Sequence, residues 1–325
     1  MIQVEHLTKC YGGVAAVDDL SFEIESGHVY GFLGPNGAGK STTMNIMAGC
    51  LSATKGRVII DGFDMFEEPA QAKKRIGYLP EQPPLYMNET PEEYLRFVGE
   101  AKGLRGRELR SQIDSAVERT GLGQVRNRKI SALSKGYKQR TGIAQALLGN
   151  PEVIILDEPT VGLDPIQIIE IRGLIRDLGK EHTVIFSSHI LSEVQAICEK
   201  ILIIARGRIM AFDGPENLEK LLLSPGEITL LAEADSKETQ ELLSGVGHIT
   251  EQTIEEKERG RTAVTLRSDC GDIHEVSKAL FQRFASAGKP LLEINVKKAG
   301  LEEIFIELTE NSKTEEAEAG EEEPV

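Results

Sequence analysis

The sequence contains no tryptophan, and aromatic residues make up only 5% of its 325 residues. An RNA-binding surface built on base stacking needs exposed aromatic rings, so this chain offers no such platform. Positive charge is also scarce, because 37 Lys and Arg are outnumbered by 52 Asp and Glu and the formal net charge is −15. A nucleic-acid backbone attracts basic proteins. We therefore expect no nucleic acid among the partners.

Paired cysteines and long apolar runs are missing as well. The four cysteines are far apart in the sequence, so no CxxC metal or redox motif exists; they are Cys10, Cys50, Cys198 and Cys270. We expect reduced thiols in a cytosolic protein. No apolar run reaches the roughly 18 residues that span a bilayer, and the first residues lack the apolar core of a secretory signal. If the protein works at a membrane, another chain must cross it.

The apolar segments that are present predict an α/β fold. Strand candidates such as "EVIILDEP" and "HTVIFSSH" alternate with helix-like stretches up to about residue 220, which favours a mostly parallel sheet covered by helices. Two β-like runs in residues 1–30 predict an N-terminal antiparallel β subdomain. Residues of about 83–150 contain three helix-like stretches, and we expect them to form a helical insertion.

A second domain is predicted after the stretch "LLLSPGE", where Pro and Gly end a helix. We place one domain at 1–222 and a small α+β domain at 223–310, which closes with the amphipathic helix "LEEIFIELTE". Its expected roles are dimer support, regulation or contact with a partner. Residues 311–325 carry six Glu and form a predicted disordered acidic tail.

The stretch "GPNGAGKS" at 34–41 is a complete G-x-x-x-x-G-K-[ST] phosphate loop. Its glycines allow backbone N–H groups to turn inward around phosphate oxygens. Lys40 supplies a positive charge, and the Ser41 hydroxyl can ligate Mg²⁺. An apolar strand precedes the loop and a helix follows it, so the helix dipole also favours the anion. A chance glycine-rich turn before a helix is the competing interpretation.

Two further strand ends carry polar side chains. In "VIILDE", Asp157 can hold Mg²⁺ and Glu158 can act as general base toward a water. The alternative is a buried strand that ends in two solvated acids. His189 follows the strand in "FSSH" and is a candidate γ-phosphate sensor, although a histidine at a strand end is often only a cap or a packed polar residue.

Together these motifs resemble those of the ATP-binding cassette (ABC) transporters. The order "GPNGAGKS", "YLPEQPPLY", "LSKGYKQR", "VIILDEPT", "GLDP" and "SSH" is similar to that family over about residues 1–220. The resemblance implies a P-loop NTPase cassette that hydrolyses ATP with Mg²⁺. The implied ATP-binding residues are Tyr11, which stacks on adenine, and Gly34, Pro35, Asn36, Gly37, Ala38, Gly39, Lys40, Ser41 and Thr42.

The resemblance also implies individual roles. Glu158 is the catalytic base, His189 the switch histidine, and Gln82 of "YLPEQPPLY" contacts Mg²⁺ and water beside Ser41 and Asp157. Glu81 competes with Gln82 for that assignment. Asp164 matches a loop that communicates between two cassettes.

The stretch "LSKGYKQR" at 133–140 resembles the family's signature motif, usually LSGGQ. In the family this motif reaches the γ-phosphate of ATP held by a second cassette, so Ser134, Lys135 and Gly136 are expected to act in trans. Lys135 and Tyr137 depart from the common form. Lys135 either adds charge toward the nucleotide or, with Tyr137, points to solvent.

The chain most resembles a stand-alone ATPase subunit of an exporter-like system. Translation-type cassettes usually occur as two in one chain, and DNA-repair cassettes are split by a long coiled coil; neither fits. The implied partners are a separate membrane permease and a second cassette, either a copy or a paralogue, at the cytoplasmic face of the cell membrane. The alternative is a regulatory protein that uses ATP binding as a switch and has no permease.

Overall fold

The computed structural model describes residues 1–221, 226–258, 260–270 and 273–297. The chain divides into two compact units, Met1–Pro215 and Glu216–Val325, and each is treated by itself below. The predicted domain boundary at 222/223 falls at residues outside the described ranges, as do the expected helix at 301–310 and the acidic tail.

The centre of the first unit is a six-stranded sheet in the order β10-β9-β3-β8-β7-β6. The five strands from β9 to β6 are parallel, whereas β10 joins β9 as an antiparallel edge strand. The central strands are apolar runs buried on both faces, as in β7, where all four residues are buried. This confirms the predicted mostly parallel sheet. The strand bounds are β3 Val29–Leu33, β6 Ile76–Leu79, β7 Val153–Leu156, β8 Thr183–Ser188, β9 Lys200–Ala205 and β10 Arg208–Asp213.

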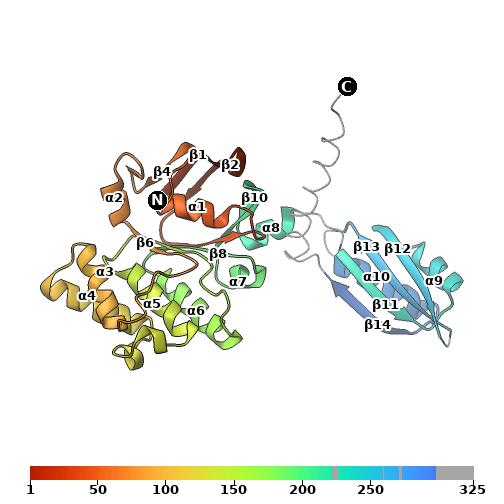
Figure 1. Ribbon diagram of the computed structural model, residues 1–325. Helices are drawn as coiled ribbons and strands as arrows, with labels where there is room; N and C mark the ends of the chain where they lie inside the picture. The colour runs from red at the N-terminus through yellow and green to blue at the C-terminus, as the bar shows by residue number, and fades with distance from the viewer. Residues whose placement is uncertain (222–225, 259, 271–272, 298–325) are drawn as a thin grey trace, which may run out of the picture. The chain divides into compact units, whose positions relative to one another are not determined.

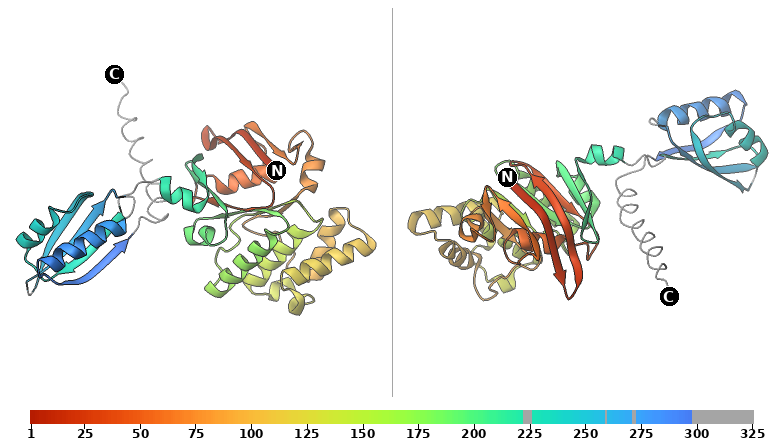
Figure 2. Two further views of the ribbon diagram at one scale, coloured as in Figure 1. Left: turned by 180° about the vertical axis from the view of Figure 1, so that it is seen from behind. Right: turned by 90° about the horizontal axis from the view of Figure 1, so that it is seen from above.

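A second sheet of four antiparallel strands, in the order β2-β1-β4-β5, forms the predicted N-terminal β subdomain. Helix α1, Lys40–Met47, lies between this sheet and the parallel one (Figures 1 and 2). Its Met44, Ile46 and Met47 are fully buried and join apolar side chains of both sheets in one core. Helix α1 is therefore held between the two sheets by the apolar side chains of its second turn. The strand bounds are β1 Ile2–Tyr11, β2 Val14–Ile24, β4 Lys55–Ile60 and β5 Phe63–Asp64.

The helical insertion is confirmed on the opposite side of the parallel sheet (Figure 1). Helix α3 starts at Pro91 because Thr90 caps it: the Thr90 hydroxyl accepts from the Glu93 N–H and the Glu93 carboxylate accepts from the Thr90 N–H. The remaining bounds of this unit are α2 Pro69–Lys74, α3 Pro91–Ala101, α4 Gly106–Arg119, η1 Gly123–Val125, η2 Ile130–Ala132, α5 Lys135–Leu147, α6 Pro165–Leu178 and α7 Leu191–Gln195. Helix α8, Pro215–Leu221, begins at the division between the units.

The second unit confirms the predicted α+β domain. Its elements run β-α-β-β-α-β, and its antiparallel sheet has the order β12-β13-β11-β14, which is the ferredoxin-like arrangement. Alternate residues of β13 are buried, and Val264 and Leu266 pack with Leu280 and Phe284 of α10. The bounds are β11 Gly226–Ala232, α9 Ser236–Leu243, β12 Ile249–Lys257, β13 Arg261–Ser268, α10 Ile273–Ser286 and β14 Leu291–Lys297.

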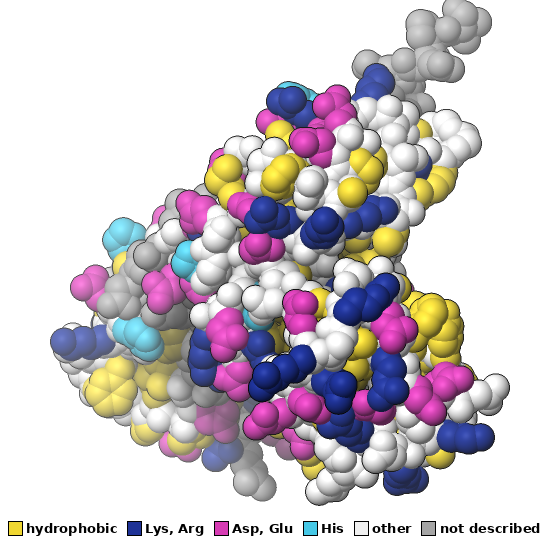
Figure 3. All heavy atoms as spheres, turned by 90° about the vertical axis from the view of Figure 1, so that its left-hand side faces the viewer, with side chains coloured by type: hydrophobic (Ala, Val, Ile, Leu, Met, Phe, Trp, Pro, Cys, Tyr) yellow, Lys and Arg dark blue, Asp and Glu magenta, His cyan; other side chains and the backbone are white. Residues whose placement is uncertain are grey.

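One side of the first unit shows a surface of mixed charge. On the side of the first unit that carries α2, α3 and α4, basic and acidic side chains interleave and hydrophobic patches interrupt them (Figure 3). Within the described ranges, no helix has the length and apolar character needed to cross a bilayer.

Candidate functional site

The phosphate loop connects the C-terminal end of β3 to α1. Gly37 and Gly39 have φ of +82° and +103°, a region that side chains with a Cβ rarely adopt. A Cβ on Gly39 would lie 2.6 Å from the backbone oxygen of Ala16 in β2. Glycine is therefore required at 39 both by its backbone angle and by the close passage of the neighbouring strand, and the loop wraps around the start of α1.

Lys40 is buried, with 5% of its surface exposed. Its ammonium donates to the carbonyl oxygens of Gly34 at 2.7 Å and Pro35 at 3.2 Å. It also lies 3.3 Å from Oε1 of Glu158, whose side chain is 8% exposed. The charge that the sequence assigns to phosphate binding thus pairs with the carboxylate assigned to catalysis.

Asp157 and Ser41 form a suitable pair of oxygens for Mg²⁺. The Ser41 hydroxyl donates to Asp157 Oδ1 at 3.0 Å, and the Ser187 hydroxyl donates to the same oxygen at 2.7 Å. Burial raises the pKa of Asp157 above its usual value, with smaller contributions from Glu158 and Glu81. The described residues contain no group of three or more His, Cys, Asp or Glu side chains that is placed to hold a metal ion by itself. A hydroxyl and one carboxylate fit Mg²⁺, which keeps waters and substrate phosphates as its other ligands.

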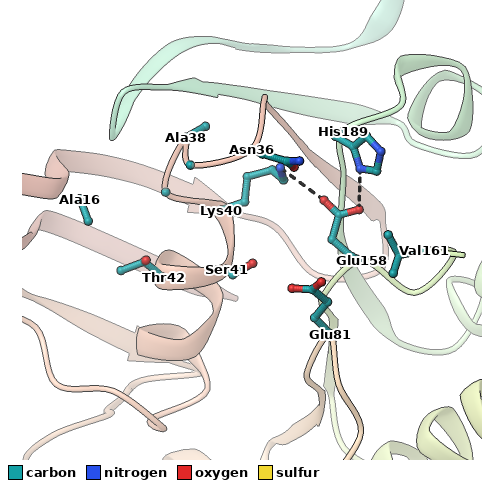
Figure 4. A pocket seen from close by; sticks show the side chains of 12 residues that line it. Ala16, Asn36, Ala38, Lys40, Ser41, Thr42, Glu81, Glu158, Val161 and His189 are labelled. Carbon is teal, nitrogen blue, oxygen red and sulfur yellow. Dashed lines mark hydrogen bonds and ion pairs between the residues drawn. The ribbon is translucent and has the colours of Figure 1, made fainter.

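Glu158 is the second residue after β7, behind Asp157, and has a φ of +46°, a strained value for a residue with a side chain. Its Oε2 lies 3.0 Å from Nδ1 of His189, the residue that follows β8 (Figure 4). Because a carboxylate only accepts hydrogen bonds, the imidazole donates from Nδ1 and presents Nε2 as its second polar atom. Glu158 is therefore contacted by Lys40 through one oxygen and by His189 through the other.

A cavity of about 480 Å³ opens at this point. Its lining includes most of the predicted phosphate-binding residues; the full set is Ala16, Asn36, Gly37, Ala38, Gly39, Lys40, Ser41, Thr42, Glu81, Glu158, Val161 and His189. Gln82 is exposed and is absent from the lining, whereas its neighbour Glu81 points into the same space (Figure 4). Tyr11 is 51% exposed, and the Lys9 ammonium lies 5.3 Å from its ring centroid. The adenine role of Tyr11 stays a prediction.

The signature residues line a second cavity instead. Ser134 and Gly136 lie there with Asp164, which caps the N-terminus of α6 by accepting from the Gln167 N–H at 2.9 Å. A Cβ on Gly136 would lie 2.8 Å from the amide end of the Gln167 side chain, so a larger residue at 136 would displace that amide. The structure therefore brings the predicted residues together in two groups, the phosphate loop with the carboxylates and the signature motif with Asp164.

Lys135 is exposed and its side chain crosses the loop that follows Glu158. An ideal Cβ on Gly162 would lie 2.1 Å from the Lys135 ammonium nitrogen. Gly162 has a φ of +66°. The ammonium thus rests against the backbone between Glu158 and Asp164.

Residues outside the expected set also shape the first cavity. Ala16 and Val161 line it, and Ser187 reaches Asp157 from the next strand. The only sequence signal for Ser187 is its position in "FSSH", two residues before a predicted site residue.

Comparison with known proteins gives the family. A family model described as "ABC transporter" matches residues 17–161. The linearmycin resistance ATP-binding protein LnrL of Bacillus subtilis (strain 168) is 32% identical over 312 residues, which cover 95% of this chain and 98% of that protein. The chain belongs to the ABC transporter ATP-binding proteins.

Two further relatives of this ABC subunit bear on its site. The bacitracin transport ATP-binding protein BcrA of Bacillus licheniformis is 41% identical over 212 residues, covering 65% of this chain and 68% of that protein. A dimeric post-hydrolysis cassette bound to ADP and Pi is 27% identical, with a TM-score of 0.61 over 66% of this chain and 98% of that chain. These matches show that the chain has the P-loop NTPase cassette fold. They also show that it is the ATP-binding subunit of a transporter. The coverage of LnrL extends the similarity into the second unit.

Proposed function

We propose that this ABC subunit hydrolyses ATP with Glu158 as general base, His189 as γ-phosphate contact and Lys40 as phosphate charge. The observation that carries the proposal is the convergence of Lys40 and His189 on the two oxygens of a buried Glu158, at 3.3 and 3.0 Å. A buried carboxylate held between two donors beside a phosphate loop has the position that a water-activating base requires.

The reaction is a displacement at phosphorus. Glu158 accepts a proton from water, the water oxygen bonds to the γ-phosphorus, and the bond from that phosphorus to the ADP oxygen breaks. The phosphate-loop N–H groups and Lys40 stabilise the charge that develops on the phosphate oxygens. Ser41 and Asp157 would hold Mg²⁺, which supplies further neutralisation of that charge.

The Lys40–Glu158 ion pair couples binding to activation. Both side chains are nearly buried, so each depends on the other for charge compensation. A γ-phosphate competes with Glu158 for the same ammonium. ATP binding therefore releases one oxygen of the carboxylate from Lys40 at the moment when a water has to be deprotonated.

The separation of the site into two cavities supports a composite site formed by two cassettes. The cavity at Ser134 and Asp164 continues onto α6, where Ile166 and Ile169 are 71% and 61% exposed. Exposed large apolar side chains beside a polar cavity favour a protein interface. We place a second cassette there, a copy or a paralogue, with its phosphate loop opposite Ser134.

An aromatic patch on the helical insertion supports contact with a permease. Tyr86, Met87 and Phe97 are about half exposed at 48%, 46% and 52%. The Tyr86 and Phe97 ring centroids are 5.2 Å apart. Because the relatives are named for linearmycin resistance and bacitracin transport, the proposed permease exports an antibiotic.

The proposal is tested by Glu158→Gln in the full chain. The variant should bind ATP with affinity close to that of the unaltered protein, accumulate as a dimer with ATP and Mg²⁺, and hydrolyse ATP at least about a hundredfold more slowly. Glu152→Gln is the matched control, since Glu152 immediately precedes β7 but is about half exposed and pairs with Arg75. Hydrolysis by Glu158→Gln at the rate of the control would show that Glu158 is not the base.

A further inference from the structure

A buried carboxylate outside the expected set lies behind the site. Glu193, in α7, is 3% exposed. Its Oε2 accepts hydrogen bonds from the hydroxyls of Ser188 at 2.8 Å and Thr160 at 2.7 Å. Among the described residues no basic side chain forms an ion pair with it. Two hydroxyl groups are therefore its identified polar partners.

The two hydroxyls belong to the segments that carry the Glu158–His189 pair. Thr160 follows Glu158 by two residues, and Ser188 immediately precedes His189. The Ser188 hydroxyl also accepts from the Ile190 N–H at 3.0 Å, so it orients the backbone on both sides of His189. One oxygen of Glu193 thereby joins the ends of β7 and β8 next to the reacting groups.

Ser187 makes a second link between the same two strand ends. Its hydroxyl accepts from the Glu158 N–H at 2.8 Å and donates to Asp157 Oδ1 at 2.7 Å. The hydrogen bond from the Glu158 N–H to Ser187 holds the backbone of Glu158, whose φ is +46°. A strained backbone persists only where surrounding contacts determine it, and Ser187 and the Glu193 bonds to Thr160 and Ser188 supply those contacts.

The cluster of Glu193, Thr160 and Ser188 contains a buried carboxylate, which the packing of the core does not require. Burying a carboxylate costs free energy unless its hydrogen bonds are good, and an apolar side chain of similar size would often stabilise the same space as well. A carboxylate that fixes two hydroxyls gives directional control of both segments, which an apolar contact lacks. That control matters here because His189 and Glu158 must stay within hydrogen-bond distance.

We propose that Glu193 is a positioning residue for ATP hydrolysis, which holds Glu158 and His189 in register through Thr160 and Ser188. This inference rests on the proposed roles of Glu158 and His189. Glu193 does not line the cavity, so it acts through the residues that do. Its effect should fall on the hydrolytic step rather than on ATP binding.

Single substitutions in the full chain test the first half of this inference. Glu193→Gln, Thr160→Val and Ser188→Ala should each lower kcat by roughly 10- to 100-fold, because a displaced catalytic group loses rate steeply. The Kd for ATP should change by less than about threefold. Thr262→Val is the matched control: Thr262 is fully buried and donates to the Ala234 carbonyl at 2.7 Å in the second unit, and it should leave kcat unchanged. Equal kcat in Thr160→Val and the control would overturn the inference.

Combined substitutions separate positioning from general loss of stability. In a background that carries both Glu158→Gln and His189→Ala, adding Glu193→Gln should change the residual single-turnover rate by less than about twofold, because both groups that Glu193 positions are already replaced. A further tenfold loss there would show that Glu193 acts independently of Glu158 and His189 and would overturn the inference. If Glu158→Gln itself hydrolyses ATP normally, the proposed function fails instead, and the two failures are distinguishable.

Discussion

The two units of this chain differ most in what they bury. The first unit buries five side chains of Lys, His, Asp or Glu at less than 9% exposure each, which are Lys40, Asp157, Glu158, His182 and Glu193. In the described part of the second unit, the buried polar side chains are hydroxyls only, those of Thr239, Thr262 and Ser268. The sheets and helices of both units are otherwise built by the same apolar patterning.

The difference indicates where the chain does chemistry. Buried charge is costly unless it is paired or hydrogen-bonded, so a fold retains it where a reaction uses it. Four of the five groups lie at the site or one contact behind it. His182 is the exception, because its Nδ1 meets the Pro151 carbonyl at 2.8 Å, away from the cavity. The described part of the second unit buries no Lys, Arg, His, Asp or Glu side chain.

The largest predicted effect concerns the core of the second unit. Phe284→Ala removes a fully buried ring and should destabilise that unit by about 3–5 kcal/mol. Because the chain divides into two compact units, we expect hydrogen exchange of the first unit to be unchanged. Loss of exchange protection in β3 or β7 would show that the second unit supports the site.

The next prediction compares a buried with an exposed ion pair. Lys40→Ala leaves Glu158 without its cation and should lower ATP hydrolysis at least about a hundredfold. Lys289→Ala removes a 2.6 Å pair with Glu238 in the second unit, whose side chains are 32% and 42% exposed, and should change stability by less than about 1 kcal/mol. Steady-state ATPase assays and thermal unfolding check both. Similar losses of activity in the two variants would contradict the division between the units.

A third prediction asks which residue of "YLPEQPPLY" belongs to the charged cluster. The cavity lining favours Glu81, so Glu81→Ala should lower the Mg²⁺-dependent hydrolysis rate by about tenfold, and Gln82→Ala by about twofold at most. The measurement is kcat across a Mg²⁺ titration. The reverse order would support the assignment of Gln82 made from the family pattern.

The smallest predicted effect is at the surface of the first unit. Lys135→Gly restores the residue that the common signature motif has at this position, and it removes the contact between the Lys135 ammonium and Gly162. Because Lys135 is exposed, the apparent KM for ATP should change by only about two- to fivefold. Lys257→Ala is the control, since Lys257 is also exposed and pairs with Glu255 in the second unit. A change above about twentyfold would indicate direct contact of Lys135 with phosphate.

Much of the first unit was predictable because its signals are local. The phosphate loop, the apolar strand before Asp157 and the helix caps at Thr90 and Ser134 are each set by residues close in sequence. The α+β composition of the second unit followed from the same kind of pattern. Its strand order did not, since β11 pairs with β13 and β14 rather than with β12.

The contacts that escaped prediction are those between distant segments. Glu193 of α7 meets Thr160, which lies 33 residues earlier, and Ser187 meets Asp157 from a different strand. No spacing rule relates such residues before the register is known. The sequence could not decide between Glu81 and Gln82 for another reason. The choice depends on how the chain turns after β6, because a shift of one residue would place a different side chain in the cavity.

The strand order of the parallel sheet also has a consequence for synthesis on the ribosome. Strand β3 leads into the phosphate loop, yet its two neighbours in the sheet are β8 and β9. Val29 therefore cannot pair until Val184 has been synthesised, and Tyr30 cannot pair with β9 until Lys200 has been synthesised. Pairing between such remote segments is slow, and the apolar β3 stays without its ladder until most of the first unit has emerged. The phosphate loop is thus among the first segments to be translated and among the last to reach its folded conformation. A chain truncated before β8 lacks the strand that holds β3 in the sheet and cannot form the loop.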